Sequence, residues 1–244
     1  MSRFRTLTAA ALLTCVSTTA LAEVTANGSV TNNYLWRGLT QSNNEAAVQG
    51  GIDYANDSGF YIGTWASNVE YGSDDGYSYE HDVYLGYSGG SDDFSWDVGY
   101  LYYNYDDSQK FDFGEVYGSI GVGGFSATLS ILANTEADEP SSAVDYGFGE
   151  AYYLSLDYGF ELENGMGISL HVGQHDGDFV DAFNGIAVNG DASYIDYNVT
   201  FTVDNFSMMI SDTDLPNSGC FACGGYLDNG EMKFVVGYGM DFEL

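Results

Sequence analysis

The stretch MKFVVGYGMDF, residues 232–242, places an apolar side chain at every second position. A period of two is the period of a β-strand, because successive side chains point to opposite sides of the strand. The segment MGISLHV, residues 166–172, shows the same alternation. About a dozen such segments follow one another after residue 22, and only 2 prolines occur in 244 residues, which suits long hydrogen-bonded strands. The sequence therefore predicts an all-β chain.

The connectors between these segments are alternately short and long. The short ones carry the Gly, Asn, Asp and Ser residues that hairpin turns require, and they lie at 55–58, 88–92, 123–124, 161–165 and 203–206. The long ones lie near 69–78, 134–147, 175–192 and 212–230. A single up-and-down transmembrane β-barrel produces this alternation, with short periplasmic turns and long extracellular loops. We expect about twelve antiparallel strands, at 24–37, 46–55, 59–69, 79–88, 93–105, 111–122, 125–134, 148–160, 165–175, 192–203, 205–213 and 230–243.

The predicted strands have one apolar and one polar face. In the segment 148–160, Leu154, Leu156 and Phe160 share one side, whereas Ser155 and Asp157 share the other. The segment 59–69 is ambiguous, because aromatic residues occupy both of its sides. Bulky apolar residues on one face fit contact with lipid, and the polar face then lines the lumen. The alternative is a soluble barrel or sandwich with its apolar face inside. We favour the membrane barrel, because a soluble barrel of twelve strands has a wide interior to fill.

The first 22 residues have the composition of a secretory signal peptide. Arg3 and Arg5 precede an apolar run at residues 7–16, and residues 20–22 form a cleavage site of the A-x-A type. We expect cleavage before Glu23 and one outer-membrane barrel over residues 23–244 in a Gram-negative bacterium. The terminal stretch GYGMDFEL, residues 237–244, resembles the β-signal read by the barrel-assembly machinery. Outer-membrane lipids and lipopolysaccharide are the expected surroundings of the strands.

The chain is strongly acidic. It contains 36 Asp and Glu residues against 5 Lys and Arg residues, a formal net charge of −31. Removal of a signal peptide that carries two of the arginines would leave 3 − 36 = −33. Binding to a nucleic-acid backbone needs clustered Lys and Arg, so this charge argues against a nucleic-acid partner. The charge indicates either an affinity for cations or adaptation to a saline habitat.

The inward positions, assigned by the alternation within each strand, are rich in carboxylates. We predict a porin that lets small hydrophilic solutes diffuse passively and prefers cations, because a wall of carboxylates attracts cations and repels anions. Two alternatives remain: the polar groups pair into a plug, or a closed barrel acts as a structural or adhesive surface protein. No cofactor is expected. The predicted lumen and selectivity residues are Arg37, Asp53, Glu80, Asp82, Asp97, Glu115, Asp157, Asp196 and Lys233.

The most distinctive local string is NYLWRGLTQS, residues 33–42. Here the chain resembles the TorF family of outer-membrane porins of proteobacteria, whose members carry a similar segment just after the signal peptide. The resemblance implies an outer-membrane barrel and a porin function, but no particular substrate. From its place at the end of the first predicted strand, we expect Trp36 in an aromatic girdle at the membrane interface. Arg37 is expected to point inward and to pair with lumen carboxylates.

Other motifs are weaker. Cys220 and Cys223 form a C-x-x-C pair in a long connector, for which we predict a small loop-closing disulfide. His171 and His175 lie four residues apart on one strand, about 13 Å along it, which is too far for one metal ion. No metal site is predicted. An enzyme of the barrel-phospholipase type would need Ser and His together on the outer face; we find no Ser to partner His81, and no enzymatic activity is expected.

Overall fold

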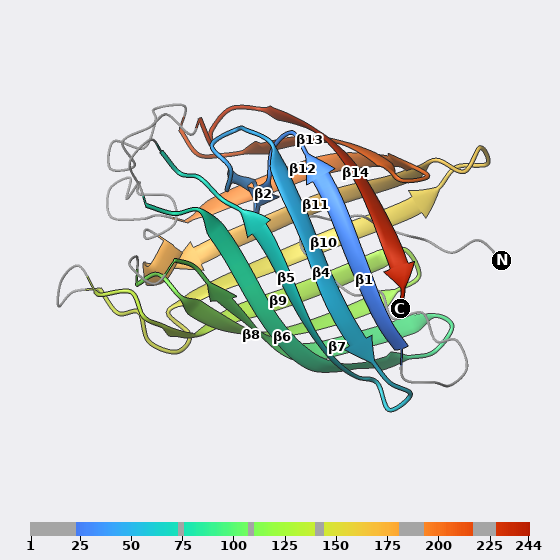
Figure 1. Cartoon of the computed structure of the whole chain (residues 1–244), viewed down its shortest axis with the longest axis horizontal. Coiled ribbons are helices and arrows are strands. Elements are labelled where there is room, and N and C mark those ends of the chain that lie inside the picture. Colours follow the sequence, from blue (N-terminus) through green and yellow to red (C-terminus); the bar gives the residue numbers. More distant parts are fainter. Residues whose placement is uncertain (1–22, 73–75, 107–109, 140–143, 181–192, 217–227) are drawn as a thin grey trace.

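The computed structural model describes residues 23–72, 76–106, 110–139, 144–180, 193–216 and 228–244. Twelve of its strands form a closed antiparallel barrel, in which the first strand pairs with the last (Figure 1). The predicted architecture of twelve antiparallel strands is therefore confirmed. The barrel strands are β1 (Glu23–Thr31), β4 (Ala47–Ala55), β5 (Phe60–Asn68), β6 (Tyr79–Gly90), β7 (Phe94–Asn104), β8 (Phe113–Val122), β9 (Phe125–Thr135), β10 (Ala151–Glu161), β11 (Gly167–Gly177), β12 (Tyr194–Val203), β13 (Phe206–Thr213) and β14 (Lys233–Glu243).

The two ends of the barrel differ in their connections. The start of β1, the end of β14 and the short hairpin turns share one end, which we call the short-turn end. The strand ends that flank the long connectors, such as Asn68 and Tyr79, or Thr135 and Ala151, lie at the other end, the loop end (Figure 1). In the turn between β4 and β5, Gly59 has a φ of 87°, a conformation that favours glycine. Within the described residues, no helix is long and apolar enough to cross a membrane.

The predicted first strand, 24–37, is wrong at its C-terminal end. Strand β1 stops at Thr31, and the chain then turns into the barrel as a small hairpin of β2 (Leu35–Trp36) and β3 (Leu39–Thr40). The two residues at its tip, Arg37 and Gly38, both have positive φ angles, 50° and 78°. Positive φ at both central residues is the geometry of a type I′ hairpin turn, which reverses the chain within two residues. We call residues 32–46 the lumen hairpin.

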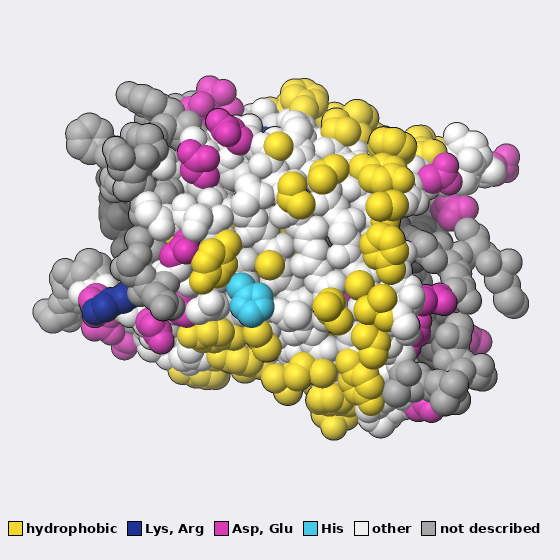
Figure 2. Space-filling model, viewed as in Figure 1, with side chains coloured by type: hydrophobic (Ala, Val, Ile, Leu, Met, Phe, Trp, Pro, Cys, Tyr) yellow, Lys and Arg dark blue, Asp and Glu magenta, His cyan; other side chains and the backbone are white. Residues whose placement is uncertain are grey.

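The outer face of the barrel is apolar. Large Val, Leu, Ile, Phe, Tyr and Met side chains are exposed on the barrel strands, and Figure 2 shows hydrophobic side chains along the flanks of the face in view. The ambiguous strand β5 follows the same rule, since Ile62 is 42% exposed whereas Tyr61 is 1% exposed. The aromatic side chains of β5 that face inward are therefore Tyr61 and Trp65, and Trp65 packs against Tyr34 inside the barrel.

Several inward glycines lie beneath tyrosine rings. A Cβ atom at Gly63 would overlap the ring of Tyr84, and one at Gly86 would overlap Tyr61. The same relation holds between Gly173 and Tyr153. Glycine side chains by themselves would leave open space in the lumen. At these positions, tyrosines of neighbouring strands fill that space.

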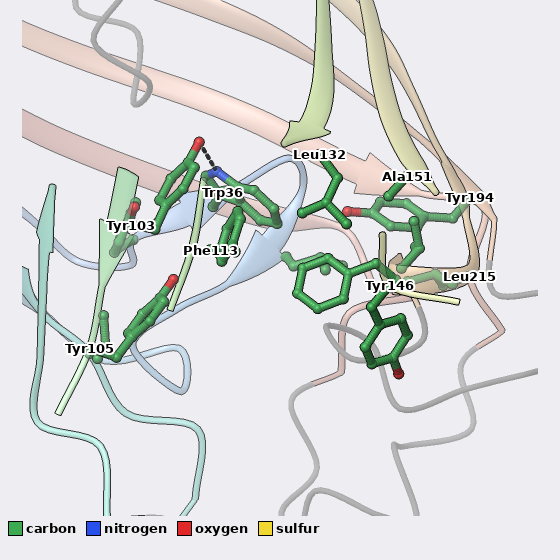
Figure 3. Packing of buried hydrophobic residues seen from close by; sticks show 14 of the residues in the cluster. Trp36, Tyr103, Tyr105, Phe113, Leu132, Tyr146, Ala151, Tyr194 and Leu215 are labelled. Atoms are coloured by element: carbon green, nitrogen blue, oxygen red, sulfur yellow. Dashed lines mark hydrogen bonds between the residues drawn. The ribbon is translucent and has the colours of Figure 1, made fainter. Parts of the chain in front are cut away.

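A hydrophobic core lies inside the barrel at its loop end. It surrounds the lumen hairpin and draws residues from the loop ends of several strands (Figure 3). Trp36 meets Phe113 edge to face, with ring centroids 6.1 Å apart, and Phe113 stacks on Tyr103 at 4.2 Å. Its buried members are Tyr34, Trp36, Leu39, Ala47, Val69, Tyr103, Tyr105, Phe113, Leu132, Tyr146, Ala151, Phe179, Val180, Tyr194 and Leu215.

Candidate functional site

Arg37 at the tip of the lumen hairpin forms a buried ion pair with Glu115 on β8. Its Nη2 lies 2.6 Å from Glu115 Oε2, and the two side chains are only 7% and 6% exposed. The guanidinium is also held between two rings, 4.2 Å from the centroid of Trp36 and 4.3 Å from that of Tyr153. Burial lowers the pKa of Arg37, but Glu115, Tyr103 and Tyr153 together raise it, and the pKa lies above its ordinary value. Arg37 is therefore a fixed positive charge, and the expected pairing with a lumen carboxylate is observed.

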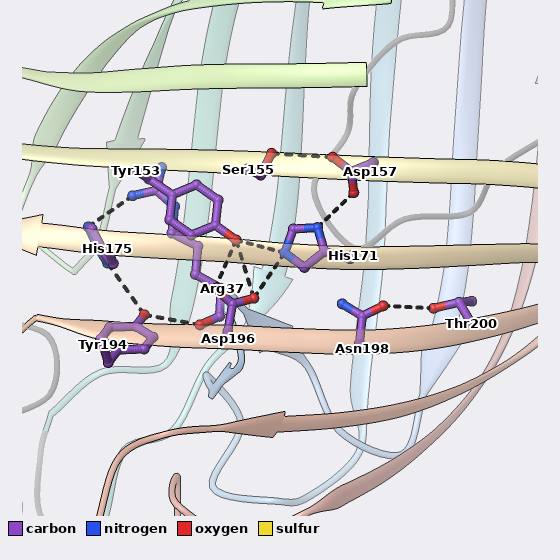
Figure 4. A network of polar contacts seen from close by, with 10 residues as sticks. All are labelled: Arg37, Tyr153, Ser155, Asp157, His171, His175, Tyr194, Asp196, Asn198 and Thr200. Carbon is purple, nitrogen blue, oxygen red and sulfur yellow. Dashed lines mark hydrogen bonds and ion pairs between the residues drawn. The ribbon is translucent and has the colours of Figure 1, made fainter. Parts of the chain in front are cut away.

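His175 on β11 completes a ring of contacts around the hairpin tip (Figure 4). Arg37 Nη1 lies 3.1 Å from His175 Nε2. Because a guanidinium can only donate, Nε2 must accept, and the neutral ring then carries its proton on Nδ1. That nitrogen lies 3.3 Å from the Tyr194 hydroxyl, which donates to the Arg37 carbonyl at 3.0 Å. The ring holds both the side chain and the backbone of Arg37.

The hairpin tip fits tightly against the opposite wall. A Cβ atom at Gly38 would lie 2.7 Å from Asp196 Cβ and 2.7 Å from Thr213 Cγ2, so only glycine fits here. The base of the hairpin is anchored elsewhere: the Tyr34 hydroxyl donates to Glu80 on β6 at 2.9 Å, and the Thr40 N–H donates to Asn229 at 3.0 Å. The hairpin thus spans the lumen from wall to wall.

A second polar network lies beside the tip, around His171 (Figure 4). Its Nδ1 is 2.7 Å from Asp157 and its Nε2 is 3.0 Å from Asp196. Since each ring nitrogen meets a carboxylate, the geometry favours the doubly protonated imidazolium. The Tyr153 hydroxyl donates to Asp196 at 2.9 Å and links this network to the ring that stacks on Arg37.

Most of the remaining predicted lumen residues are inward-facing and already hydrogen-bonded. Asp53 accepts from Tyr84 at 2.5 Å, and Asp97 accepts from Tyr61 at 2.7 Å. Lys233 donates to the backbone oxygen of Asp228 at 2.7 Å.

Two predicted lumen residues on β6 differ from each other. Glu80 accepts from Tyr34 at 2.9 Å and from Tyr105 at 3.0 Å. Asp82 is buried as well, yet its Oδ1 has no hydrogen-bond partner. Cys220 and Cys223 lie outside the described residues. Within those residues, no group of three or more His, Cys, Asp or Glu is arranged to hold a metal ion.

The predicted place of Trp36 in an aromatic girdle is wrong. Its side chain is buried inside the barrel, and its indole N–H donates to the Tyr103 hydroxyl at 3.3 Å. The cause is that the chain leaves the barrel wall after Thr31, so that Trp36 lies in the hairpin inside the barrel.

His81 on β6 lies 2.7 Å from the Thr64 hydroxyl on β5 through its Nε2. That hydroxyl has a single proton, which it donates to the Asp82 carbonyl at 2.9 Å, so the histidine donates to Thr64. A histidine that donates here cannot act as a base toward this hydroxyl.

Comparisons with known proteins give the family of the chain and its fold. Residues 16–236, which include the lumen hairpin, match the model of a family described as "Bacterial protein of unknown function (Gcw_chp)". The chain belongs to the Gcw_chp family. No curated protein matches it. Among solved structures, it is similar to the KdgM porin in complex with disordered oligogalacturonate, with 9% identity and a TM-score of 0.52, over 91% of this chain and 99% of that one. The NanC porin gives 8% identity and a TM-score of 0.51, over 91% and 100%. These likenesses show the fold.

The site of this Gcw_chp barrel contains donors that sequence reasoning missed, namely the inward tyrosines. Tyr61, Tyr84 and Tyr153 each donate to a buried carboxylate. The sequence contained an indication of these donors, because Tyr153 shares the polar face of its strand with Ser155 and Asp157. A tyrosine on the polar face of a barrel strand can bury its ring and still use its hydroxyl.

Proposed function

We propose that this Gcw_chp protein is a channel of the bacterial outer membrane that passes small hydrophilic solutes and prefers cations. The observation that carries the proposal is a closed barrel with apolar side chains outside and carboxylates inside. An exposed apolar surface of this extent is unfavourable in water and favourable in lipid. The TorF-like segment at residues 33–42 and the porin-like fold support the same function.

The lumen charge supports a preference for cations. The predicted lumen residues include seven carboxylates, Asp53, Glu80, Asp82, Asp97, Glu115, Asp157 and Asp196, against the cationic groups Arg37, His171 and Lys233. The KdgM porin was solved with oligogalacturonate, which is a polyanion. A negative lumen repels polyanions, so we propose small cations and neutral solutes for the present barrel.

The lumen hairpin limits conduction in this proposal. It spans the barrel near the loop end and lies among the buried aromatic side chains of the core. Solutes that enter from the loop end therefore meet the narrowest part of the path at the hairpin. We expect single-channel steps that are small for a barrel of twelve strands.

The outer-membrane location brings further partners. Exposed Met240 and Phe242 on β14 give this last strand an outward apolar row. This row supports the proposal that the barrel-assembly machinery reads the strand and that lipid and lipopolysaccharide then cover it. The proposed signal peptide, residues 1–22, lies outside the described residues.

The test is the reversal potential of purified protein in a planar bilayer under a KCl gradient. The proposal predicts discrete steps and a reversal potential displaced toward that of K⁺. A reversal potential displaced toward that of Cl⁻ would overturn the cation preference.

A second candidate function is a closed structural or adhesive surface protein, because the hairpin and the aromatic core fill the loop end. The closed-barrel candidate predicts no conductance steps from the wild type. It predicts conductance steps only from a variant in which residues 34–41 are replaced by a Gly-Ser linker. The absence of conductance steps from both proteins would contradict the proposed channel function.

A further inference from the structure

We propose that Asp82 binds a small monovalent inorganic cation inside the barrel. The proposal starts from the hydrogen bonds of the inward carboxylates. Six of the seven predicted lumen carboxylates contact donors of the protein itself: Asp53 contacts Tyr84, Glu80 contacts Tyr34, Asp97 contacts Tyr61, Glu115 contacts Arg37, and Asp157 and Asp196 contact His171. A cation at any of these six would compete with an existing donor.

Asp82 differs from this set. Its side chain faces inward from β6 and the residue is only 7% exposed. Its Oδ1 is the one buried side-chain oxygen or nitrogen, among the residues that the structure describes, without a hydrogen-bond partner. Burial of an unpartnered carboxylate oxygen costs about 1–3 kcal/mol or more. A bound cation would compensate that cost.

The surroundings of Asp82 are negative. Glu80 lies two residues away on the same face of β6, about 7 Å along the strand. Asp82 interacts electrostatically with the carboxylates of both Glu80 and Glu115. The guanidinium of Arg37 is held by Glu115 and by two rings, so it is already engaged. Glu115 already pairs with Arg37, so the negative charges of Asp82 and Glu80 favour a second positive charge beside them.

The chemical class follows from the oxygens and from the burial. Carboxylate and phenol oxygens are hard ligands, which suit alkali and alkaline-earth ions. Calcium takes six to eight oxygen ligands and favours several carboxylates, but the described residues contain no group of three or more acidic, His or Cys ligands. Deep burial leaves little room for a bulky organic ammonium. The geometry therefore favours Na⁺ or K⁺.

The role of this site in transport rests on the channel function proposed above, whereas binding itself does not. If the barrel conducts cations, Asp82 is the position where a cation can pause without displacing a protein donor. If the barrel does not conduct, the same ion is a resident structural ion. The experiment therefore measures binding without conduction.

The experiment compares thermal unfolding of the detergent-solubilised protein in NaCl and in N-methyl-D-glucamine chloride at equal ionic strength. The wild type is expected to unfold at a higher temperature in NaCl. Asp82→Asn removes the charge and keeps the shape, so the salt difference should disappear. Its melting temperature in N-methyl-D-glucamine chloride should exceed that of the wild type. Asp97→Asn, which alters a partnered carboxylate, should keep the salt difference.

Equal melting temperatures of the wild type in the two salts, or an unchanged salt difference in Asp82→Asn, would overturn the proposal. If Asp82→Asn does not fold, the ²³Na NMR line width of the wild-type sample decides. If the protein broadens the ²³Na line and added KCl reverses this broadening, the result supports the site. A line width equal to that of protein-free detergent rejects the site. A positive binding result with silent bilayers would reject the channel and leave the cation site standing.

Discussion

The two ends of the barrel lumen are built differently. At the loop end, a hairpin and an aromatic core bury Arg37 and Glu115 almost completely. Toward the short-turn end, inward residues such as Asn198 and Ser169 are half-buried, and Ser95 is exposed. The same strands supply both regions, so the strand pattern alone does not decide whether a lumen is filled. The filling depends on one short segment that leaves the wall and on the donors that hold it.

Loss of the Arg37 guanidinium, which anchors the hairpin at the loop end, should cause the largest loss of stability. Arg37→Ala leaves Glu115 as a buried carboxylate without its cation, and breaking a buried pair in this way costs about 3–5 kcal/mol. The check is the free energy of unfolding by denaturant in detergent micelles. The exposed Lys110→Ala serves as a control and should change it by less than about 0.5 kcal/mol. Equal losses in the two variants would contradict a hairpin anchored by Arg37.

A methyl group at the hairpin tip should have the next largest effect. In Gly38→Ala, the added Cβ meets Asp196 and Thr213, and a residue with a side chain must adopt a φ of 78°. We expect a loss of roughly 2–4 kcal/mol from backbone strain and overlap together. Gly149→Ala is a matched control, because Gly149 has a φ of 88° but no atom within 4 Å of the added Cβ. It should lose only about 1 kcal/mol, measured by the same unfolding titration. A control variant as unstable as Gly38→Ala would show that overlap at the tip contributes nothing.

A smaller effect is expected in the short-turn half. Tyr61→Phe removes the hydroxyl that donates to Asp97 at 2.7 Å and also contacts Tyr117. Loss of one of the donors to the buried Asp97 carboxylate should cost about 1–2 kcal/mol. Tyr87→Phe, on the exposed outer face, provides the comparison and should be nearly neutral by thermal melting. The prediction is wrong if the two variants melt at the same temperature.

The barrel itself was predictable from the sequence because its signal is repeated. Each strand shows the period of two, and the alternation of connectors gives the topology. The assignment of inward carboxylates followed from the same period, and Asp53, Asp97 and Glu115 face the lumen. Because the pattern is repeated in about a dozen strands, a deviation in one strand does not change the predicted barrel.

The lumen hairpin was not predictable in this way. Residues 24–37 read as one strand, because they contain no proline and most of their apolar residues, Val24, Ala26, Val30, Tyr34 and Trp36, fall on one face of the alternation. The deviation is set by two adjacent positive φ angles, at Arg37 and Gly38, and by contacts with strands far away in the sequence. Local periodicity contains no information on such contacts. The tyrosines over inward glycines are a second case, since the glycine alone suggests open space and its neighbour determines how that space is used.

Single-channel conductance in planar bilayers tests the central claim most directly, that an inward hairpin restricts an acidic lumen within a membrane barrel. The wild type is compared with a variant in which residues 34–41 are replaced by a Gly-Ser linker. The structure predicts a several-fold larger conductance in the variant, with the cation preference retained. Equal conductance of the two proteins, or the absence of steps from both, would contradict it.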